Sequence, residues 1–275
     1  MQFVEYHFYI QPIAPWTEIL IAHLAQSSFD TFEETDSGLK AYILADEDEP
    51  EFVNEVLERL DEAHITFERK VMDKVNWNEE WETHFKPVEV NGKCYIRAEF
   101  HQPEPGYDYE IVIQPKMSFG TGHHETTHLM VEQMLEMDFE GKKVLDMGAG
   151  TGILAILAAM RGATPVVGID IDEWSYQNAV ENAERNGVDI HFIQGGAESI
   201  PQEEYDVVLA NINKNILQED MLFYSNVLPA GASLLLSGIY DFDFEDIQET
   251  AKKHGLEFEE KRNRNQWISV LFKKK

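Results

Sequence analysis

The stretch VLDMGAGTGIL at residues 144–154 places three glycines at alternating positions directly after a short apolar run. Glycine suits such a turn because it adopts left-handed dihedral angles freely and has no side chain to keep a ligand away from the backbone. The apolar residues that begin at Ile153 then follow a helical spacing. A strand, a glycine-rich turn and a helix in this order predict a nucleoside or nucleotide site in an α/β protein.

The spacing of the glycines separates two kinds of ligand. A dinucleotide fingerprint has its third glycine three residues after the second, but Gly148, Gly150 and Gly152 alternate and Ile153 occupies the later position. The turn therefore departs from a pyrophosphate cradle. With Asp146 before the glycines, it resembles the first motif of class I methyltransferases that use S-adenosylmethionine, a cofactor without phosphate groups.

Apolar strands and helices alternate on both sides of this turn. The expected strands are 143–146, 166–170, 190–194, 207–211 and 232–237, and the expected helices are 153–161, 173–186, 216–227 and 245–254. Two closing strands are expected at 258–262 and 267–273. Because strands that alternate with helices form right-handed βαβ units, this part predicts a mostly parallel, doubly wound sheet, the Rossmann-like architecture.

The beginning of the chain has a different pattern. Residues 1–74 predict strand, helix, strand, strand, helix and strand, the order of a small α+β domain of the ferredoxin-like kind. This domain shows no catalytic constellation, so we expect it to recognise a substrate. Residues 75–88 predict a linker helix that carries Trp77 and Trp81 on one face, where they grip a ligand or pack at a domain junction. The catalytic domain is expected at 89–275.

Composition narrows the partners. With 22 Lys and Arg against 51 Asp and Glu, the formal net charge is −29, which disfavours sequence-specific binding to nucleic acid and favours a basic protein as partner. Alternatively, the acidity serves only to keep the protein soluble. Cys94 is the single cysteine, which excludes an intramolecular disulfide. Neither a membrane span nor a signal peptide is predicted, so we expect a cytoplasmic protein, monomeric by default.

Two polar residues end strands of the predicted sheet. Asp170 ends the strand after the glycine turn, where such folds present a carboxylate to ribose hydroxyls. Asn211 ends the strand 207–211, and its amide is able to accept from an attacking amine while donating to a cofactor. Capping of the following helix is the alternative role for each of them.

The string HETTH at 124–128 satisfies the zinc protease pattern H-E-x-x-H. On a helix, His124 and His128 would share a face and Glu125 would act as a general base. The string lies at a helix start behind two glycines, with no third ligand at a known spacing, and the glycine turn follows. We therefore expect no metal at this site.

Taken together, the strings FGTGHHETTHLM, VLDMGAGTGILAI, GIDID, ENAERNGV, ANI and LSGI resemble the PrmA family, the bacterial methyltransferases of ribosomal protein L11. The resemblance covers roughly Trp77 to Gly238. It implies that the second threonine of the TT pair, Thr127, contacts S-adenosylmethionine. The glycine turn (Gly148 and Gly150), the strand-end acid Asp170 and the strand-end amide Asn211 are expected to bind the same cofactor.

The resemblance implies transfer of methyl groups to lysine ε-amines, or to the α-amine, of ribosomal protein L11, with the N-terminal domain binding that protein. Asn211 and the loop residues Phe119 and Thr121 are expected to orient the amine. The polar string 213–215 and the pair Met117-Ser118 depart from the family pattern. Ala197 and Glu198 are expected to flank the adenine.

Other functions remain open at this point. The chain is alternatively a methyltransferase of another protein, an RNA or a small molecule. It is also compatible with a non-catalytic protein that senses the cofactor and docks on ribosomes. No NPPY-like string follows Asn211, which weakens the case for methylation of an amide or a nucleobase.

Overall fold

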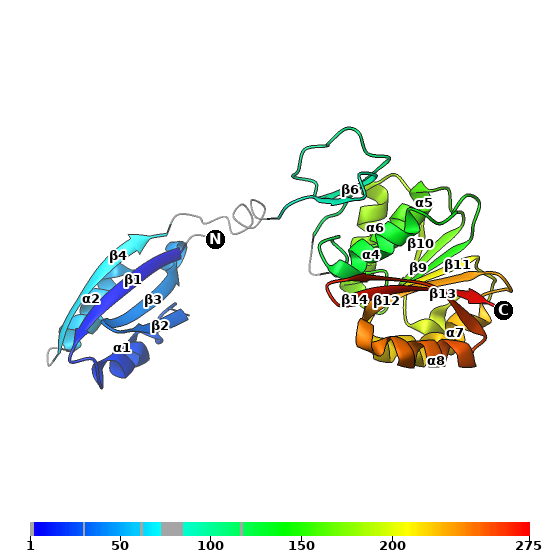
Figure 1. The fold of residues 1–275 in the computed structure, drawn as a ribbon. Helices are drawn as coiled ribbons and strands as arrows, with labels where there is room; N and C mark the ends of the chain where they lie inside the picture. Colours follow the sequence, from blue (N-terminus) through cyan, green and yellow to red (C-terminus); the bar gives the residue numbers. More distant parts are fainter. Residues whose placement is uncertain (1–2, 30, 61–62, 73–84, 116–117) are drawn as a thin grey trace. The chain divides into compact units, whose positions relative to one another are not determined.

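A computed structural model describes residues 3–29, 31–60, 63–72, 85–115 and 118–275. The chain divides into two compact units, Met1–His84 and Phe85–Lys275 (Figure 1). Trp77, Trp81 and residues 75–84 of the predicted linker helix lie outside the described residues. Residues 85–87 have no regular secondary structure, and Val88 begins a strand. No helix in the described part of the chain is long and apolar enough to cross a membrane.

The N-terminal unit is a four-stranded antiparallel sheet with two helices. Its elements follow one another as β1 (Phe3–Gln11), α1 (Trp16–Leu24), β2 (Thr31–Thr35), β3 (Gly38–Leu44), α2 (Pro50–Arg59) and β4 (His64–Val71). The strand order is β2-β3-β1-β4, and neighbouring strands are antiparallel. This topology confirms the predicted ferredoxin-like arrangement.

Every second side chain of β1 points into the hydrophobic core of this unit. The side chains of Val4, Tyr6, Phe8 and Ile10 are buried, and they share a hydrophobic cluster with residues of both helices. Burial of one large apolar side chain contributes about 1.5–3 kcal/mol, so one face of a single strand supplies much of the stability of the unit.

The C-terminal unit contains a seven-stranded sheet. Its strands are β8 (Val144–Met147), β9 (Val166–Asp170), β10 (His191–Gln194), β11 (Val207–Asn211), β12 (Ser233–Tyr240), β13 (Leu256–Arg264) and β14 (Trp267–Lys274). They lie in the order β10-β9-β8-β11-β12-β14-β13. The first five strands are parallel, and β14 is antiparallel to both of its neighbours. The predicted doubly wound, mostly parallel sheet is confirmed.

Helices cover both faces of this sheet (Figure 1). They are α4 (Glu125–Met134), α5 (Ile153–Met160), α6 (Glu173–Arg185), α7 (Lys214–Asn226) and α8 (Phe244–Lys253). Successive residues of β11 enter different cores, since Val207 and Leu209 belong to one hydrophobic cluster and Val208 and Ala210 to the other. The strand is therefore apolar throughout, as parallel strands buried on both faces are.

The chain leaves β8 toward β9 on one side, and β11 lies on the other side of β8. In open α/β sheets, a crevice forms at the carboxyl ends of the strands where the winding direction reverses in this way. The glycine turn, the end of β9 and the end of β11 all meet at this crevice.

A smaller sheet precedes this domain core. It consists of β5 (Val88–Val90), β6 (Cys94–Arg97) and β7 (Tyr109–Val112). Asn91 and Gly92 have φ angles of 54° and 62°, so the predicted turn at this pair joins β5 to β6 in the left-handed conformation that Asn and Gly tolerate best. After β7, the chain runs toward the loop that carries Phe119.

Candidate active site

A cavity of about 620 Å³ opens at the crevice. The glycine turn and the ends of β9 and β11 contribute Gly148, Gly150, Asp170 and Asn211 to its wall, and Phe119 and Trp267 line it from other segments. Ala197 and Glu198, which the sequence placed beside the adenine, line it too. Seven of the nine residues predicted for the cofactor and the amine therefore lie around one cavity; Thr127 and Thr121 are not among its lining residues.

The glycine turn has no room for side chains. Gly148 and Gly150 have φ angles of +67° and +57°. A Cβ atom on Gly148 would lie 2.3 Å from Cγ2 of Ile212, and one on Gly150 would lie 2.4 Å from the backbone oxygen of Phe119. Both glycines are thus required by their conformation, as inferred from the sequence, and also by the close approach of Ile212 and Phe119, whereas the sequence had suggested the close approach of a ligand.

Asp170 is held at the mouth of the turn. Its Oδ2 accepts the backbone N–H of Gly150 at 2.8 Å, and its Oδ1 accepts that of Asp172 at 2.9 Å. The capping role belongs to Asp172, whose side chain accepts from the backbone N–H of Ser175 at the start of α6. Asp170 therefore does not cap α6, which was its alternative role. Its carboxylate lines the cavity.

Asn211, like Asp170, does not cap the helix that follows it. Asn213, and not Asn211, caps α7 by accepting from the backbone N–H of Ile216 at 3.3 Å. Nδ2 of Asn211 donates to Oγ1 of the buried Thr127 at 3.3 Å. Oδ1 of Asn211 is buried and has no hydrogen-bond partner among the described residues. A buried oxygen without a donor is costly unless a ligand supplies one.

The polar string 213–215 has a local explanation. Asn213 caps α7, and Nζ of Lys214 donates to Asp243 at 2.9 Å and to Asp246 at 2.6 Å. The helix consequently begins at Lys214, two residues before the predicted start. This departure from the family pattern extends a helix, while Asn213 also lines the cavity.

Asp146 lies beneath the turn. Its side chain is fully buried, and its Oδ2 accepts the backbone N–H of Ala155 in the first turn of α5 at 3.1 Å. Burial, opposed by the hydrogen bond from Ala155 and aided by the charge of Asp170, raises the pKa of this carboxyl to about 7. Asp146 thus ties the strand to the helix across the glycine turn.

Of the two residues in the loop 118–124 that were expected to orient the amine, only Phe119 lines the cavity. Phe119 is 52% exposed and lines the cavity, and its ring meets that of His124 at 5.1 Å between centroids. Thr121, expected to orient the amine, bonds to Nδ1 of His123 at 3.1 Å. Nε2 of His123 lies 2.7 Å from the backbone oxygen of Lys86. Thr121 therefore holds the loop to the segment that precedes β5.

The HETTH string starts a helix. His124 is the N-cap of α4, and its Nδ1 accepts from the backbone N–H of Thr126. Glu125 accepts from the amide of Asn265, and burial lowers the pKa of His128. In residues 3–29, 31–60, 63–72, 85–115 and 118–275, no three His, Cys, Asp or Glu side chains form a group able to hold a metal ion.

Trp267, which sequence reasoning missed, lines the cavity. The ring of Trp267 lies 4.8 Å from that of His124 and stacks on Tyr240 at 3.9 Å. Tyr240 in turn stacks on the exposed Phe242 at 5.2 Å. Trp267 reaches the site because β14 pairs with β12. Its sequence neighbourhood contains no motif that would have indicated this position.

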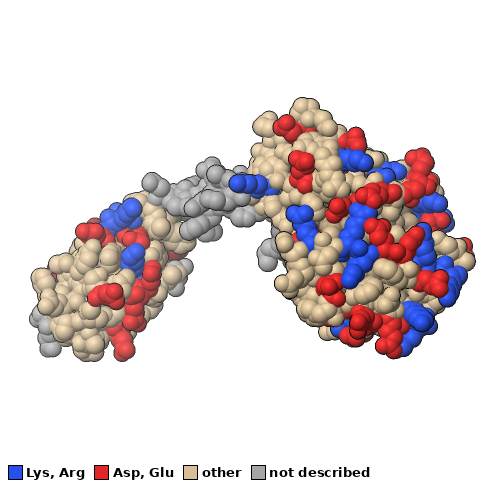
Figure 2. Space-filling view, viewed as in Figure 1, with Lys and Arg blue, Asp and Glu red and all other residues tan. Residues whose placement is uncertain are grey.

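Basic side chains near the C-terminus are paired with carboxylates. Arg262 contacts Glu136 at 2.5 Å, and Lys261 contacts Asp241 at 2.7 Å. On the face shown in Figure 2, Lys and Arg side chains alternate with Asp and Glu across the larger unit. The charges of Lys261 and Arg262 are thus balanced by neighbouring carboxylates.

Comparison with known proteins agrees with this geometry. The model of the family described as "Ribosomal protein L11 methyltransferase (PrmA)" matches residues 19–275. The chain belongs to this family. A relative of that name from Bacteroides fragilis is 41% identical over 99% of both chains. Another from Porphyromonas gingivalis is 42% identical over 93% of this chain and 90% of its own.

Solved structures of methyltransferases share the fold. A ribosomal protein L11 methylase from Lactobacillus delbrueckii has a TM-score of 0.65 and 26% identity, and covers 70% of this chain and 100% of its own. A 16S rRNA N2 G1207 methyltransferase from T. thermophilus, solved with AdoMet and guanosine, has a TM-score of 0.50 and 20% identity. It covers 57% of this chain and 45% of its own. The larger unit is thus a Rossmann-like class I methyltransferase domain.

Proposed function

We propose that this protein transfers methyl groups from S-adenosylmethionine to ribosomal protein L11, at lysine ε-amines or the α-amine. The observation that carries the proposal is that Asp170 and Asn211 line the same cavity beside the glycine turn. Family membership supports both the reaction and the protein substrate.

The residues present fit the cofactor. The side-chain-free backbone of the glycine turn lines the cavity, and Oδ1 of Asn211 is a buried acceptor in need of a donor. Gly148, Gly150, Asp170 and Asn211 would hold S-adenosylmethionine, with Thr127 acting through Asn211. Bound there, the cofactor supplies an electrophilic methyl group on a sulfonium.

The protein's own contribution is alignment. Oδ1 of Asn211 accepts one N–H of the incoming amine, which points the nitrogen lone pair into the cavity. Phe119 covers the amine from the opposite loop and excludes water. Such positioning supplies a large share of the rate in a displacement between two bound molecules.

The amine must be neutral to attack. A free lysine has a pKa of about 10.4, so exposing its lone pair at pH 7 costs about 4.6 kcal/mol. Desolvation in a largely apolar cavity lowers the pKa of an amine and reduces this cost. Water at the open mouth takes the proton, and Thr121 positions the loop through His123 rather than touching the amine.

The N-terminal unit has its own core and sheet, and we propose that it binds the protein substrate. The formal net charge of −29 favours a basic partner, and ribosomal proteins that contact RNA are basic in general. A ribosomal substrate places the enzyme in the cytoplasm, where we expect it to act as a monomer.

Purified protein incubated with methyl-labelled S-adenosylmethionine and a mixture of ribosomal proteins tests this function. We expect label on L11 and its loss in the variant Asp170→Ala. Label on another protein, an RNA or a small molecule would replace the substrate. Cofactor binding by calorimetry without any label would favour a non-catalytic sensor that docks on ribosomes.

A further inference from the structure

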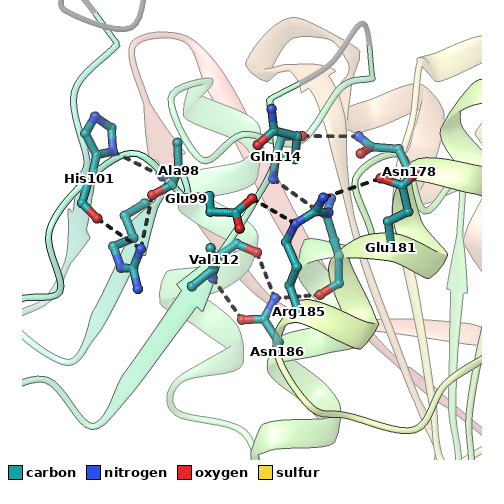
Figure 3. Close-up of polar contacts among 11 residues, drawn as sticks. Ala98, Glu99, His101, Val112, Gln114, Asn178, Glu181, Arg185 and Asn186 are labelled. Atoms are coloured by element: carbon teal, nitrogen blue, oxygen red, sulfur yellow. Dashed lines mark hydrogen bonds and ion pairs between the residues drawn. The ribbon is translucent and has the colours of Figure 1, made fainter.

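Two asparagines of α6 and the asparagine that caps its C-terminus face the segment that leads from β7 toward the active-site loop. Asn178, Asn182 and Asn186 recur at every fourth position, so they share one side of the helix. Figure 3 shows Asn178 and Asn186 beside the chain at Val112 and Gln114.

Asn186 forms the two backbone hydrogen bonds with β7 that a neighbouring strand would form. Its Oδ1 accepts the backbone N–H of Val112 at 2.8 Å, and its Nδ2 donates to the backbone oxygen of the same residue at 2.8 Å. A carboxamide is suited to this role because it carries a donor and an acceptor side by side, as a peptide group does. Asn186 therefore docks the helix against β7, away from the cavity wall.

Asn182 makes a different connection. Its side chain is completely buried, and its Oδ1 accepts the backbone N–H of Gln114 at 2.9 Å. Its Nδ2 donates to the backbone oxygen of Thr151 in the glycine turn, also at 2.9 Å. One carboxamide thus joins the segment that enters the Phe119 loop to the turn that frames the cofactor cavity.

Thr151 completes the connection on the other side. Its backbone N–H donates to the backbone oxygen of Phe119 at 2.9 Å, and its Oγ1 donates to that of Gly120. Thr151 is itself fully buried. The loop is consequently fixed to the turn at two points: through Asn182 before Phe119, and through Thr151 at Phe119 and Gly120.

We infer that Asn182 is a positioning residue for methyl transfer, because it sets the distance between Phe119 and the glycine turn. This inference rests on the proposed function. Phe119 stands on the amine side of the cavity and the glycine turn on the cofactor side, so a shift between them misaligns the two reactants. Displacements of about 1 Å lower the rates of such reactions on the order of 100-fold.

The variant Asn182→Ala tests the inference, with Asn186→Ala as the matched control on the same helix. Asn182→Ala removes two hydrogen bonds to the backbone and one from Arg185, and Asn186→Ala removes three to the backbone, but only the first breaks the link to Thr151. We expect Asn182→Ala to lower kcat for L11 at least about tenfold. Its dissociation constant for S-adenosylmethionine stays within about threefold. Asn186→Ala keeps kcat within about twofold.

Amide hydrogen exchange supplies a readout that does not depend on activity. In Asn182→Ala, exchange quickens at Gln114 and at the backbone of the Phe119 loop, whereas in Asn186→Ala it quickens at Val112. Should Asn182→Ala fail to fold, Asn182→Ser leaves a polar side chain that is too short to reach both the N–H of Gln114 and the backbone oxygen of Thr151. We expect Asn182→Ser to lower kcat as well.

A folded Asn182→Ala with wild-type kcat would overturn the inference, as would an equal loss of kcat in Asn186→Ala. Retention of wild-type kcat by a folded Asn182→Ser would do the same. These results leave the proposed function intact, since they require an active wild-type enzyme. Absence of methyl transfer by the wild-type chain would instead overturn the proposed function and this inference together.

Discussion

Oδ2 of Asp170 accepts the backbone N–H of Gly150 at 2.8 Å, so the end of β9 is tied to the middle of the glycine turn. A carboxylate oxygen accepts more than one hydrogen bond, and Asp170 therefore retains acceptor sites for ligand hydroxyls. The same side chain shapes the turn and offers its charge to the cavity. This dual use makes the residue a sensitive point for cofactor affinity.

Asp170→Ala should weaken S-adenosylmethionine binding by about 10–100-fold, because hydrogen bonds to a charged group contribute about 1.5–3 kcal/mol each. Isothermal titration calorimetry measures this directly. Asp172→Ala is the control, since it removes the cap of α6 at a cost of about 1 kcal/mol in unfolding free energy. Equal affinity losses in both variants would contradict a direct role for Asp170.

Gly150→Ala should reduce both stability and cofactor affinity. The added Cβ would meet the backbone oxygen of Phe119 at 2.4 Å, and the φ angle of +57° is itself unfavourable for alanine. Gly187→Ala measures the conformational strain without the clash, because Gly187 has a φ angle of +65° and no atom lies within 4 Å of its added Cβ. We expect a loss of about 1 kcal/mol at Gly187 and a clearly larger one at Gly150, measured by urea unfolding.

Asn211→Ala should lower kcat for L11 by about 100-fold or more, since it removes the carboxamide proposed to orient the amine. Thr127→Val leaves Asn211 in place but removes the acceptor of its Nδ2, so a smaller loss is expected. Thr127→Ser keeps the hydroxyl and should retain most of the activity. If Ser and Val prove equally damaging, the hydrogen bond between Thr127 and Asn211 is not what positions the amide.

Asp146 makes stability depend on pH. Burial raises the pKa of its carboxyl to about 7 in the folded chain, against about 3.9 in an unfolded one. Between these values the folded state binds the proton more tightly, so the contribution of this group to the unfolding free energy falls as pH rises from about 4 to about 7. The full difference is on the order of 4 kcal/mol.

Asp146→Asn removes this titration while keeping the shape of the side chain. Relative to wild type, the variant should gain stability from pH 5 to about pH 7 and level off toward pH 8, as followed by urea unfolding at each pH. Comparison between the two proteins cancels the titration of the other carboxylates. A difference that stays constant across this range would show that Asp146 is ionised in the folded state throughout.

Sequence reasoning reached the parts of the site whose signals are local. Gly148, Asp170 and Asn211 each stand at the end of an apolar strand, and parallel strands bring such ends to one edge of a sheet. Trp267 and the link from Asn182 to Gln114 depend on contacts between distant segments. No spacing in the chain encodes these contacts. The start of α7 was placed late because Asn213 is a cap whose polar neighbours resemble a loop.

Charge should govern the encounter with the protein substrate. The formal net charge of −29 attracts a basic partner over distances that salt shortens, because the Debye length falls from about 10 Å at 0.1 M to about 3 Å at 1 M ionic strength. We therefore expect kcat/KM for L11 to fall at least about tenfold as NaCl rises from about 0.05 M to about 0.5 M. Affinity for S-adenosylmethionine serves as the internal control and should change much less, because its contacts lie inside the cavity. A kcat/KM that is independent of salt would mean that the acidic surface serves solubility alone.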